Sequence, residues 1–237
     1  MYKLSIKKTV IKKFVTRVLA KIKGYKNRLL LTGRRKKIFC IGLNKTGTTS
    51  VKKAFKDLGF VVGDQGVATE LLQFWIKRDF RPIVKYCRTA EAFQDSPFSY
   101  PYTYVALDQA FPGSKFILTI RDNPEQWYNS ITKFHGKRWA NGRIPTKSDL
   151  KRAIRETKGR PWVVNRALFD TPEDDPYRKA ELLQFYNRHI EDVTRYFKSR
   201  PNDLLVINLS EEGAYQKFIE FLGVESLSNE FPWENRT

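Results

Sequence analysis

The stretch IFCIGLNKTGTTSVKKAFKDLG, residues 38 to 59, decides the fold that we predict for this chain. Residues 38 to 43 are apolar and predict a buried strand, and the apolar spacing that follows Gly47 predicts an amphipathic helix. Gly42 and Gly47 lie in the loop between the two. Such a loop points several backbone N–H groups and the positive end of the helix dipole at one place, where a phosphate or a sulfate would bind. The stretch therefore predicts an oxyanion site at the end of a strand.

Polar side chains belong to the same loop. We expect the anion to contact Asn44, Lys45, Thr46, Gly47, Thr48 and Thr49. In the Walker A loop of ATPases, a Lys directly follows the second Gly, and the next Ser or Thr holds a magnesium ion. Here the Lys precedes Gly47 instead. A kinase-type loop and a strand-to-helix turn without a ligand remain as alternatives.

A second anion site is predicted by FPGSKFILTIRDNPEQWYNSI, residues 111 to 131. Its apolar run, 115 to 120, predicts another strand, and the Asn-Pro-Glu that follows predicts a helix start. Arg121 would then stand at the C-terminal end of a parallel strand, where α/β proteins bind ligands. Ser130 would follow about two turns into the next helix. Two anion sites at the ends of two strands imply a ligand with separated phosphates.

The order of Lys45 and Gly47 resembles the 5′-phosphosulfate loop of the sulfotransferase family, and the resemblance extends over residues 36 to 237. Four further segments resemble the bacterial branch of that family, in the same order: QDSPF from 94, YNRHIEDVTRYFKSRPNDLLVINLSE from 186, FIEFLG from 218 and the closing FPWENRT. The resemblance implies PAPS (3′-phosphoadenosine 5′-phosphosulfate) as the sulfuryl donor, with no required metal. It also places Arg121 and Ser130 on the 3′-phosphate of PAPS. The sequence departs from the cytosolic sulfotransferases because their RKGxxGxxK loop is absent.

Length and composition predict one α/β domain with a basic N-terminal segment. A chain of 237 residues with 41% hydrophobic and 14% aromatic residues can fill a single core. Apolar runs at 38 to 43, 116 to 120 and 204 to 207 alternate with helical stretches. This alternation predicts a P-loop-type domain over residues 34 to 237, with a central, mostly parallel sheet flanked by helices.

Residues 1 to 33 predict a basic amphipathic helix. Residues 1 to 37 contain fourteen Lys or Arg and no acid, so they carry +14 of the formal net charge of +19. Helical spacing is kept by the apolar residues Leu4, Ile11, Phe14, Val15, Val18, Leu19 and Ile22. No apolar run is long enough to span a bilayer, and no signal-peptide cleavage site follows one. We expect this segment to bind an anionic membrane surface, with packing on the domain as the alternative and nucleic acid as the least favoured partner.

The two cysteines, Cys40 and Cys87, have neither the spacing of a disulfide framework nor that of a metal site. We therefore expect a reducing compartment. The predicted location is the cytoplasm, peripheral at the inner face of the membrane.

Sulfuryl transfer needs a group that neutralises the leaving oxygen and a base that takes the acceptor proton. We expect Lys45 to act on the leaving oxygen. The family uses Glu or His as the base, and our first candidate is Asp95, in a turn before Pro97 where it could equally cap the next element. His135 is the second candidate, whereas the apolar face around His189 predicts a packed structural histidine.

The acceptor is predicted only as a class. Aromatic and basic residues that could stack on sugar rings and attract acidic groups are Trp75, Tyr86, Arg88, Trp139, Arg143, Arg160, Trp162 and Arg166. We expect a saccharide or glycan acceptor. The competing functions are a P-loop kinase, for which Asp122 is the candidate metal ligand, and a non-catalytic membrane or nucleic-acid binding protein.

Overall fold

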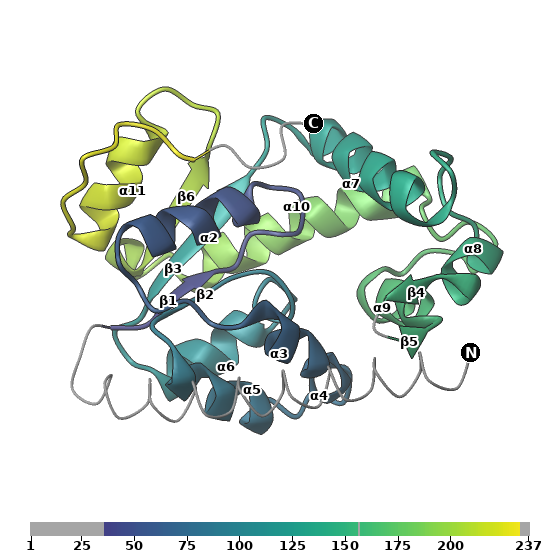
Figure 1. The fold of residues 1–237 in the computed structure, drawn as a ribbon, viewed down its shortest axis with the longest axis horizontal. Coiled ribbons are helices and arrows are strands. Elements are labelled where there is room, and N and C mark those ends of the chain that lie inside the picture. The colour runs from purple at the N-terminus through teal and green to yellow at the C-terminus, as the bar shows by residue number, and fades with distance from the viewer. Residues whose placement is uncertain (1–35, 156, 233–237) are drawn as a thin grey trace, which may run out of the picture.

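The computed structural model describes residues 36–155 and 157–232 (Figure 1). The predicted N-terminal helix over residues 1 to 33, and the domain boundary after it, lie outside the described residues. None of the helices in these two ranges combines the length and the hydropathy needed to cross a bilayer.

The centre of the fold is a sheet of four parallel strands in the order β2-β1-β3-β6. The strands are β1 (Ile38–Cys40), β2 (Ala92–Phe93), β3 (Lys115–Ile120) and β6 (Leu204–Asn208). The parallel α/β sheet and three of its strands confirm the prediction from sequence. Strand β2 was not predicted, because two apolar residues are too short a run to indicate a strand.

Side chains alternate between the two faces of the sheet, as they must in a β-strand. Phe39 of β1 lies opposite Phe93 and Phe116 in the register, and its ring centroid lies 5.6 Å and 5.4 Å from theirs. Ile38 and Cys40 point to the other face. Both faces are apolar, so each must be covered by helices.

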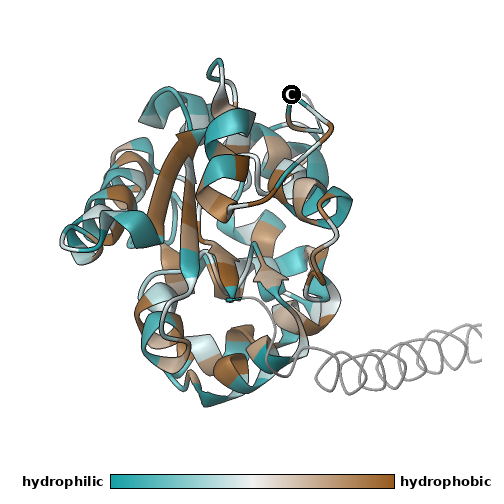
Figure 2. Ribbon diagram, turned by 90° about the vertical axis from the view of Figure 1, so that its left-hand side faces the viewer, coloured by the Kyte–Doolittle hydropathy of each residue, from teal (hydrophilic) through white to brown (hydrophobic). Residues whose placement is uncertain are grey.

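Two sets of helices cover the sheet (Figures 1 and 2). One face packs against α2 (Thr48–Asp57) and α11 (Ala214–Leu222). The other packs against α3 (Gln65–Glu70), α4 (Leu72–Ile76), α5 (Arg81–Tyr86), α6 (Thr103–Ala110) and α10 (Lys179–Tyr196). The 3-10 turns are η1 (Cys87–Thr89) and η2 (Pro201–Asp203).

A third group of elements stands beside the sheet, at the right of Figure 1. It consists of α7 (Pro124–Trp139), α8 (Lys147–Arg152), α9 (Arg160–Leu168) and the two-stranded antiparallel sheet of β4 (Ile154–Arg155) and β5 (Thr157–Lys158). Helix α7 begins where the sequence predicted, with Pro124 in its first turn and the Asn123 side chain accepting the Gln126 N–H. Helices α7 and α10 pack together through the stacked rings of Trp127 and Tyr186.

The carboxyl ends of the parallel strands meet at one edge of the sheet. Strand β1 lies between β2 and β3, so the segments that leave these three strands lie side by side. Gly42 is required here: a Cβ on it would lie 1.9 Å from Thr119 Oγ1 and within 2.7 Å of the Thr119 backbone. The fold therefore brings the ends of β1, β2 and β3 to the place where the sequence predicted an anion.

Candidate active site

The loop between β1 and α2 has an unusual backbone. Gly47, the N-cap of α2, has φ 96°, and a Cβ there would also meet Leu209 Cδ2 at 2.9 Å, so only glycine suits this position. Lys45 has φ 74°, a left-handed conformation that residues with a side chain seldom adopt. Strained positions of this kind are found at functional sites.

Three successive carbonyl groups of the loop are occupied by donors of the protein. The Thr46 hydroxyl donates to Leu43 O at 2.6 Å, Trp127 Nε1 to Asn44 O at 3.0 Å, and Arg121 Nε to Lys45 O at 2.6 Å. No side chain caps the start of α2, so the N–H groups of its first turn keep their capacity to donate. The loop therefore presents donors and a positive helix end, which is the environment that an anion requires.

A cavity of about 370 Å³ opens in front of this loop. Six of the predicted residues line it: Asn44, Lys45, Thr48, Thr49, Asp95 and His135. Its apolar and aromatic wall is formed by Leu43, Tyr100, Trp127, Ile131, Phe134, Trp139, Pro161, Val164, Leu168, Phe169, Tyr177 and Phe185, and its other polar lining by Arg138, Arg155 and Asn165.

Thr46 was expected to contact the anion, but its side chain does not line the cavity. Its side chain is buried, its backbone N–H donates to Leu43 O at 3.2 Å, and its hydroxyl bonds both Leu43 O and Thr119 Oγ1. Thr46 therefore braces the loop against β3 and does not line the cavity.

The Lys45 ammonium lies at the cavity, 4.6 Å from the centre of the Phe134 ring. Burial, and next the positive charge of Arg121, lower the pKa of Lys45. Neither cause is a negative charge, so the Lys45 ammonium lacks a negative partner among the described residues. A bound anion would supply that charge and reverse the shift.

Arg121 and Ser130 lie next to this cavity rather than in its lining. Arg121 follows β3, and its Nε bond to the Lys45 carbonyl joins the two predicted anion sites directly. Burial is the main cause that lowers the pKa of Arg121. Ser130 is on α7, three residues after Trp127 and four before Phe134, hence on the helix face that lines the cavity. Its Oγ is buried and has no hydrogen-bond partner among the described residues.

Asp95 follows β2 with φ 64°, another left-handed position. Its Oδ1 accepts hydrogen bonds from Asn44 Nδ2 and, at 2.7 Å, from the Ser96 N–H. No described residue bonds Oδ2. The carboxylate is therefore held by one oxygen at the cavity, with the second oxygen left to accept a proton.

His135, on α7, lines the same cavity as Asp95. Its Nδ1 lies 2.8 Å from the Tyr177 hydroxyl, and its ring packs on Trp139 with 4.4 Å between centroids. Burial, and next the charges of Arg155, Arg138 and Lys45, lower the pKa of His135 to about 3. The imidazole is therefore unprotonated at neutral pH, and the same burial and cations oppose its uptake of a proton.

His189 lies elsewhere, as the sequence indicated. It is buried on α10, and its Nε2–H donates to Ile41 O at 2.9 Å. This bond ties α10 to the residue that follows β1, which is a structural role.

Sequence reasoning missed several polar residues of the cavity, among them Arg138, Arg155 and Tyr177. Arg138 could have been found, because it continues the α7 face that includes Ile131 and Phe134. Arg155 and Tyr177 carry no local signal, since packing of distant segments brings them here. Of the aromatic and basic residues that the sequence singled out for the acceptor, only Trp139 lines this cavity.

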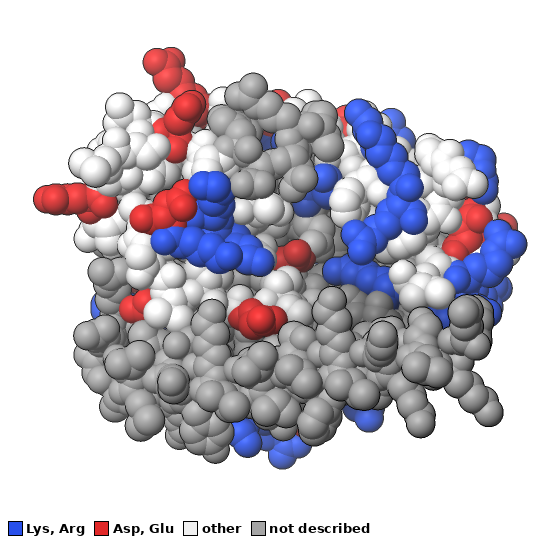
Figure 3. Space-filling model, viewed as in Figure 1, with Lys and Arg blue, Asp and Glu red and all other residues white. Residues whose placement is uncertain are grey.

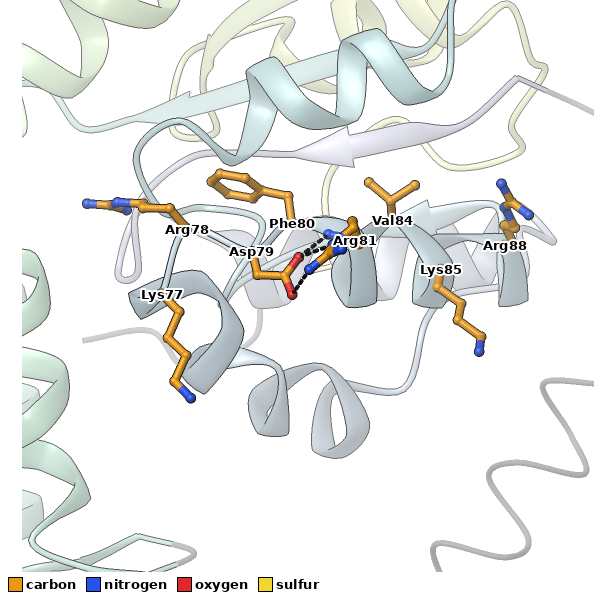
Figure 4. A pocket seen from close by; sticks show the side chains of 8 residues that line it. All are labelled: Lys77, Arg78, Asp79, Phe80, Arg81, Val84, Lys85 and Arg88. Atoms are coloured by element: carbon orange, nitrogen blue, oxygen red, sulfur yellow. Dashed lines mark hydrogen bonds and ion pairs between the residues drawn. The ribbon is translucent and has the colours of Figure 1, made fainter.

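A second, more voluminous hollow of about 840 Å³ lies along the end of α4 and α5 (Figure 4). Its lining residues are Lys77, Arg78, Asp79, Phe80, Arg81, Val84, Lys85 and Arg88, and Asp79 is paired with Arg81 at 2.7 Å. Its lining has no hydroxyl side chain, and Asp79, its one carboxylate, is already paired. Among the described residues, Lys and Arg also gather over α7 and α8 (Figure 3). The chemistry is therefore concentrated in the cavity at the strand ends.

Comparison with known proteins gives one finding that covers most of the chain. A family model described as a sulfotransferase domain matches residues 37–237. A search of curated proteins finds no match.

Proposed function

We propose a donor, a mechanism and an acceptor class for this chain, which belongs to the sulfotransferase domain family. The donor is PAPS, and the chain transfers its sulfuryl group to a hydroxyl or amino group of an acceptor. The observation that carries this proposal is the hydrogen bond from Arg121 to the Lys45 carbonyl. It sets two cationic sites side by side at the ends of β1 and β3, as a ligand with a 5′-phosphosulfate and a 3′-phosphate needs.

The loop and the start of α2 hold the 5′-phosphosulfate in this proposal. The N–H groups of the first turn and the hydroxyls of Thr48 and Thr49 donate to its oxygens, and Gly47 keeps the backbone in the conformation that points them there. Lys45 neutralises the oxygen that bridges phosphorus and sulfur. The bond between that oxygen and sulfur breaks as the acceptor oxygen bonds to sulfur, and charge on the leaving oxygen is met by the ammonium.

Arg121 and Ser130 hold the 3′-phosphate. Among the described residues, the Arg121 guanidinium donates only through its Nε, which leaves the two terminal nitrogens for a phosphate. The buried Ser130 Oγ, which lacks a partner among the described residues, would gain one from the same phosphate.

The acceptor proton goes to a base in the cavity. We propose Asp95 as that base, because its carboxylate has one oxygen held by Asn44 and one open. His135 is the second candidate: it is unprotonated at neutral pH, but the burial and the cations that lower its pKa also make it a weak base. The two candidates line one cavity, and the variants Asp95→Asn and His135→Gln distinguish them.

The acceptor is a saccharide or glycan in this proposal. Aromatic rings on α7, those of Trp127, Phe134 and Trp139, line the cavity beside Lys45. Such rings suit the apolar face of a sugar, while the neighbouring cations and amides bind its hydroxyls.

We also propose that the basic segment over residues 1 to 33 holds the enzyme at the inner face of an anionic membrane. Its sequence carries the argument, because Lys and Arg near such a surface contribute about 1 kcal/mol each. The test is sedimentation with liposomes that contain anionic lipid, at low and high salt. A chain that starts at residue 34 should remain in solution, and equal sedimentation of both chains would refute the proposal.

The kinase alternative predicts a different ligand. It requires ATP with magnesium, and its candidate metal ligand Asp122 is occupied by Gln126 Nε2 at 2.7 Å and by Asn208 Nδ2. Calorimetric titration distinguishes the sulfotransferase from the kinase. For the sulfotransferase we expect PAP, the desulfated product, to bind without magnesium and ATP to bind far more weakly. Binding of ATP that depends on magnesium, with none of PAP, would replace the proposed function by the kinase. A protein that binds neither nucleotide would be the non-catalytic alternative.

A further inference from the structure

The cavity holds more positive charge than the transfer of a sulfuryl group uses. Its charged lining consists of Lys45, Arg138, Arg155 and Asp95. Lys45 serves the leaving oxygen in the proposed function, and the carboxylate is held by Asn44. Two guanidinium groups therefore remain in the lining without a role in donor binding.

These two groups lie close to Lys45 in the cavity lining. The Lys45 ammonium is 4.6 Å and the Arg138 guanidinium 5.9 Å from the centre of the Phe134 ring. Arg155 comes from β4, outside the parallel sheet. After burial, the positive charges of Arg155, Arg138 and Lys45 lower the pKa of His135, and all four residues line the cavity.

A neutral donor lies beside them. The Nε1–H of Trp139 is buried and has no hydrogen-bond acceptor among the described residues, although Trp139 lines the cavity and packs on His135. A buried donor without an acceptor costs free energy, which a ligand oxygen would recover. Two cations and an indole N–H in one cavity wall favour an oxyanion over a neutral group.

We propose that the acceptor carries an acidic group, such as the carboxylate of a uronic acid, and that Arg138, Arg155 and Trp139 bind it. This inference rests on the proposed function and specifies its substrate class. The acidic group anchors the acceptor beside the Phe134 ring, so that a hydroxyl of the same sugar reaches the sulfur near Lys45. The Phe134 ring contacts both groups, the Lys45 ammonium and the Arg138 guanidinium. An uncharged sugar of the same size would lack the anchor.

The test compares two probes that differ in one group: 4-nitrophenyl β-D-glucuronide and 4-nitrophenyl β-D-glucoside. Each is titrated calorimetrically into the full-length protein saturated with PAP. We expect the glucuronide to bind at least tenfold more tightly than the glucoside. Arg138→Gln and Arg155→Gln should each weaken the glucuronide about tenfold while leaving the affinities for the glucoside and for PAP unchanged.

Matched controls separate this anchor from general surface charge. Lys137→Gln, on α7, and Lys158→Gln, on β5, remove exposed cations that do not line the cavity, and neither should change binding of either probe. Trp139→Phe keeps the ring and removes the N–H, and should weaken only the glucuronide. Equal binding of the two probes, no binding of the glucuronide, or variants that weaken both probes alike would overturn the inference. PAP binding in the same titrations reports on the proposed function separately: if PAP fails to bind, that proposal fails as well.

Discussion

Replacement of Lys45 by Met tests the centre of the proposed mechanism. Lys45 is the only lysine among the described residues that line the cavity, so no neighbouring ammonium can replace it at the leaving oxygen. Loss of one positioned donor to a developing oxyanion costs about 2.7 to 4 kcal/mol, or 10² to 10³ in turnover. Met keeps the apolar stem over the Phe134 ring, so the change removes the charge and little packing.

The same substitution should leave the fold intact. Lys45 forms no ion pair with a described residue, and burial already disfavours its charged form. No carboxylate would be left unpaired, so we expect the free energy of unfolding to change by less than about 1 kcal/mol. A large loss of turnover with an unchanged melting curve is the expected signature.

The assay follows formation of PAP from PAPS by anion-exchange chromatography, with water as the acceptor, so that it does not depend on the identity of the natural acceptor. Lys56→Met, an exposed position in the last turn of α2, the helix that follows the loop, is the matched control and should behave as the parent protein. Turnover of Lys45→Met within threefold of the parent would refute the role of the ammonium.

Three further substitutions address the other groups. Arg121→Ala should weaken PAP by about 1.5 to 3 kcal/mol in calorimetry and adenosine 5′-monophosphate, which lacks the 3′-phosphate, far less; equal weakening would show that Arg121 acts only through the Lys45 carbonyl. Asp95→Asn keeps an oxygen for the Asn44 bond, so it should lower turnover and spare PAP affinity; if His135→Gln does this instead, the base is misassigned. The pKa of His135 is about 3 in the folded state against about 6.5 unfolded, so the unfolded state binds more protons between these values, and stability should fall as pH is lowered through that window. Urea midpoints at pH 7 and pH 4.5 should therefore differ less in His135→Gln than in the parent, and an equal difference would refute the assigned burial.

The parts of the fold that follow from local sequence were predicted correctly. The strand, loop and helix over residues 38 to 59 could be predicted together, because the apolar pattern and the two glycines that indicate them lie within about twenty residues. The start of α7 is also local: Asn123 caps it and Pro124 occupies its first turn. By contrast, β2 is a strand only because it pairs with β1, and its two residues carry no periodicity of their own.

The sequence therefore determined the strand, loop and helix that begin at residue 38, because loop conformation and helix start depend on neighbouring residues. It also singled out Lys45 and Arg121 for the proposed anion site. Tertiary structure decided which of these groups meet. The bond between Arg121 and the Lys45 carbonyl joins residues that lie 76 positions apart, and the one from Asn44 to Asp95 joins residues 51 apart. The wall that contains Arg155 exists only because the β4–β5 hairpin, which packs against α9, brings Arg155 to the cavity that α7 also lines. Such contacts depend on the burial of whole sheet faces, which no local pattern records.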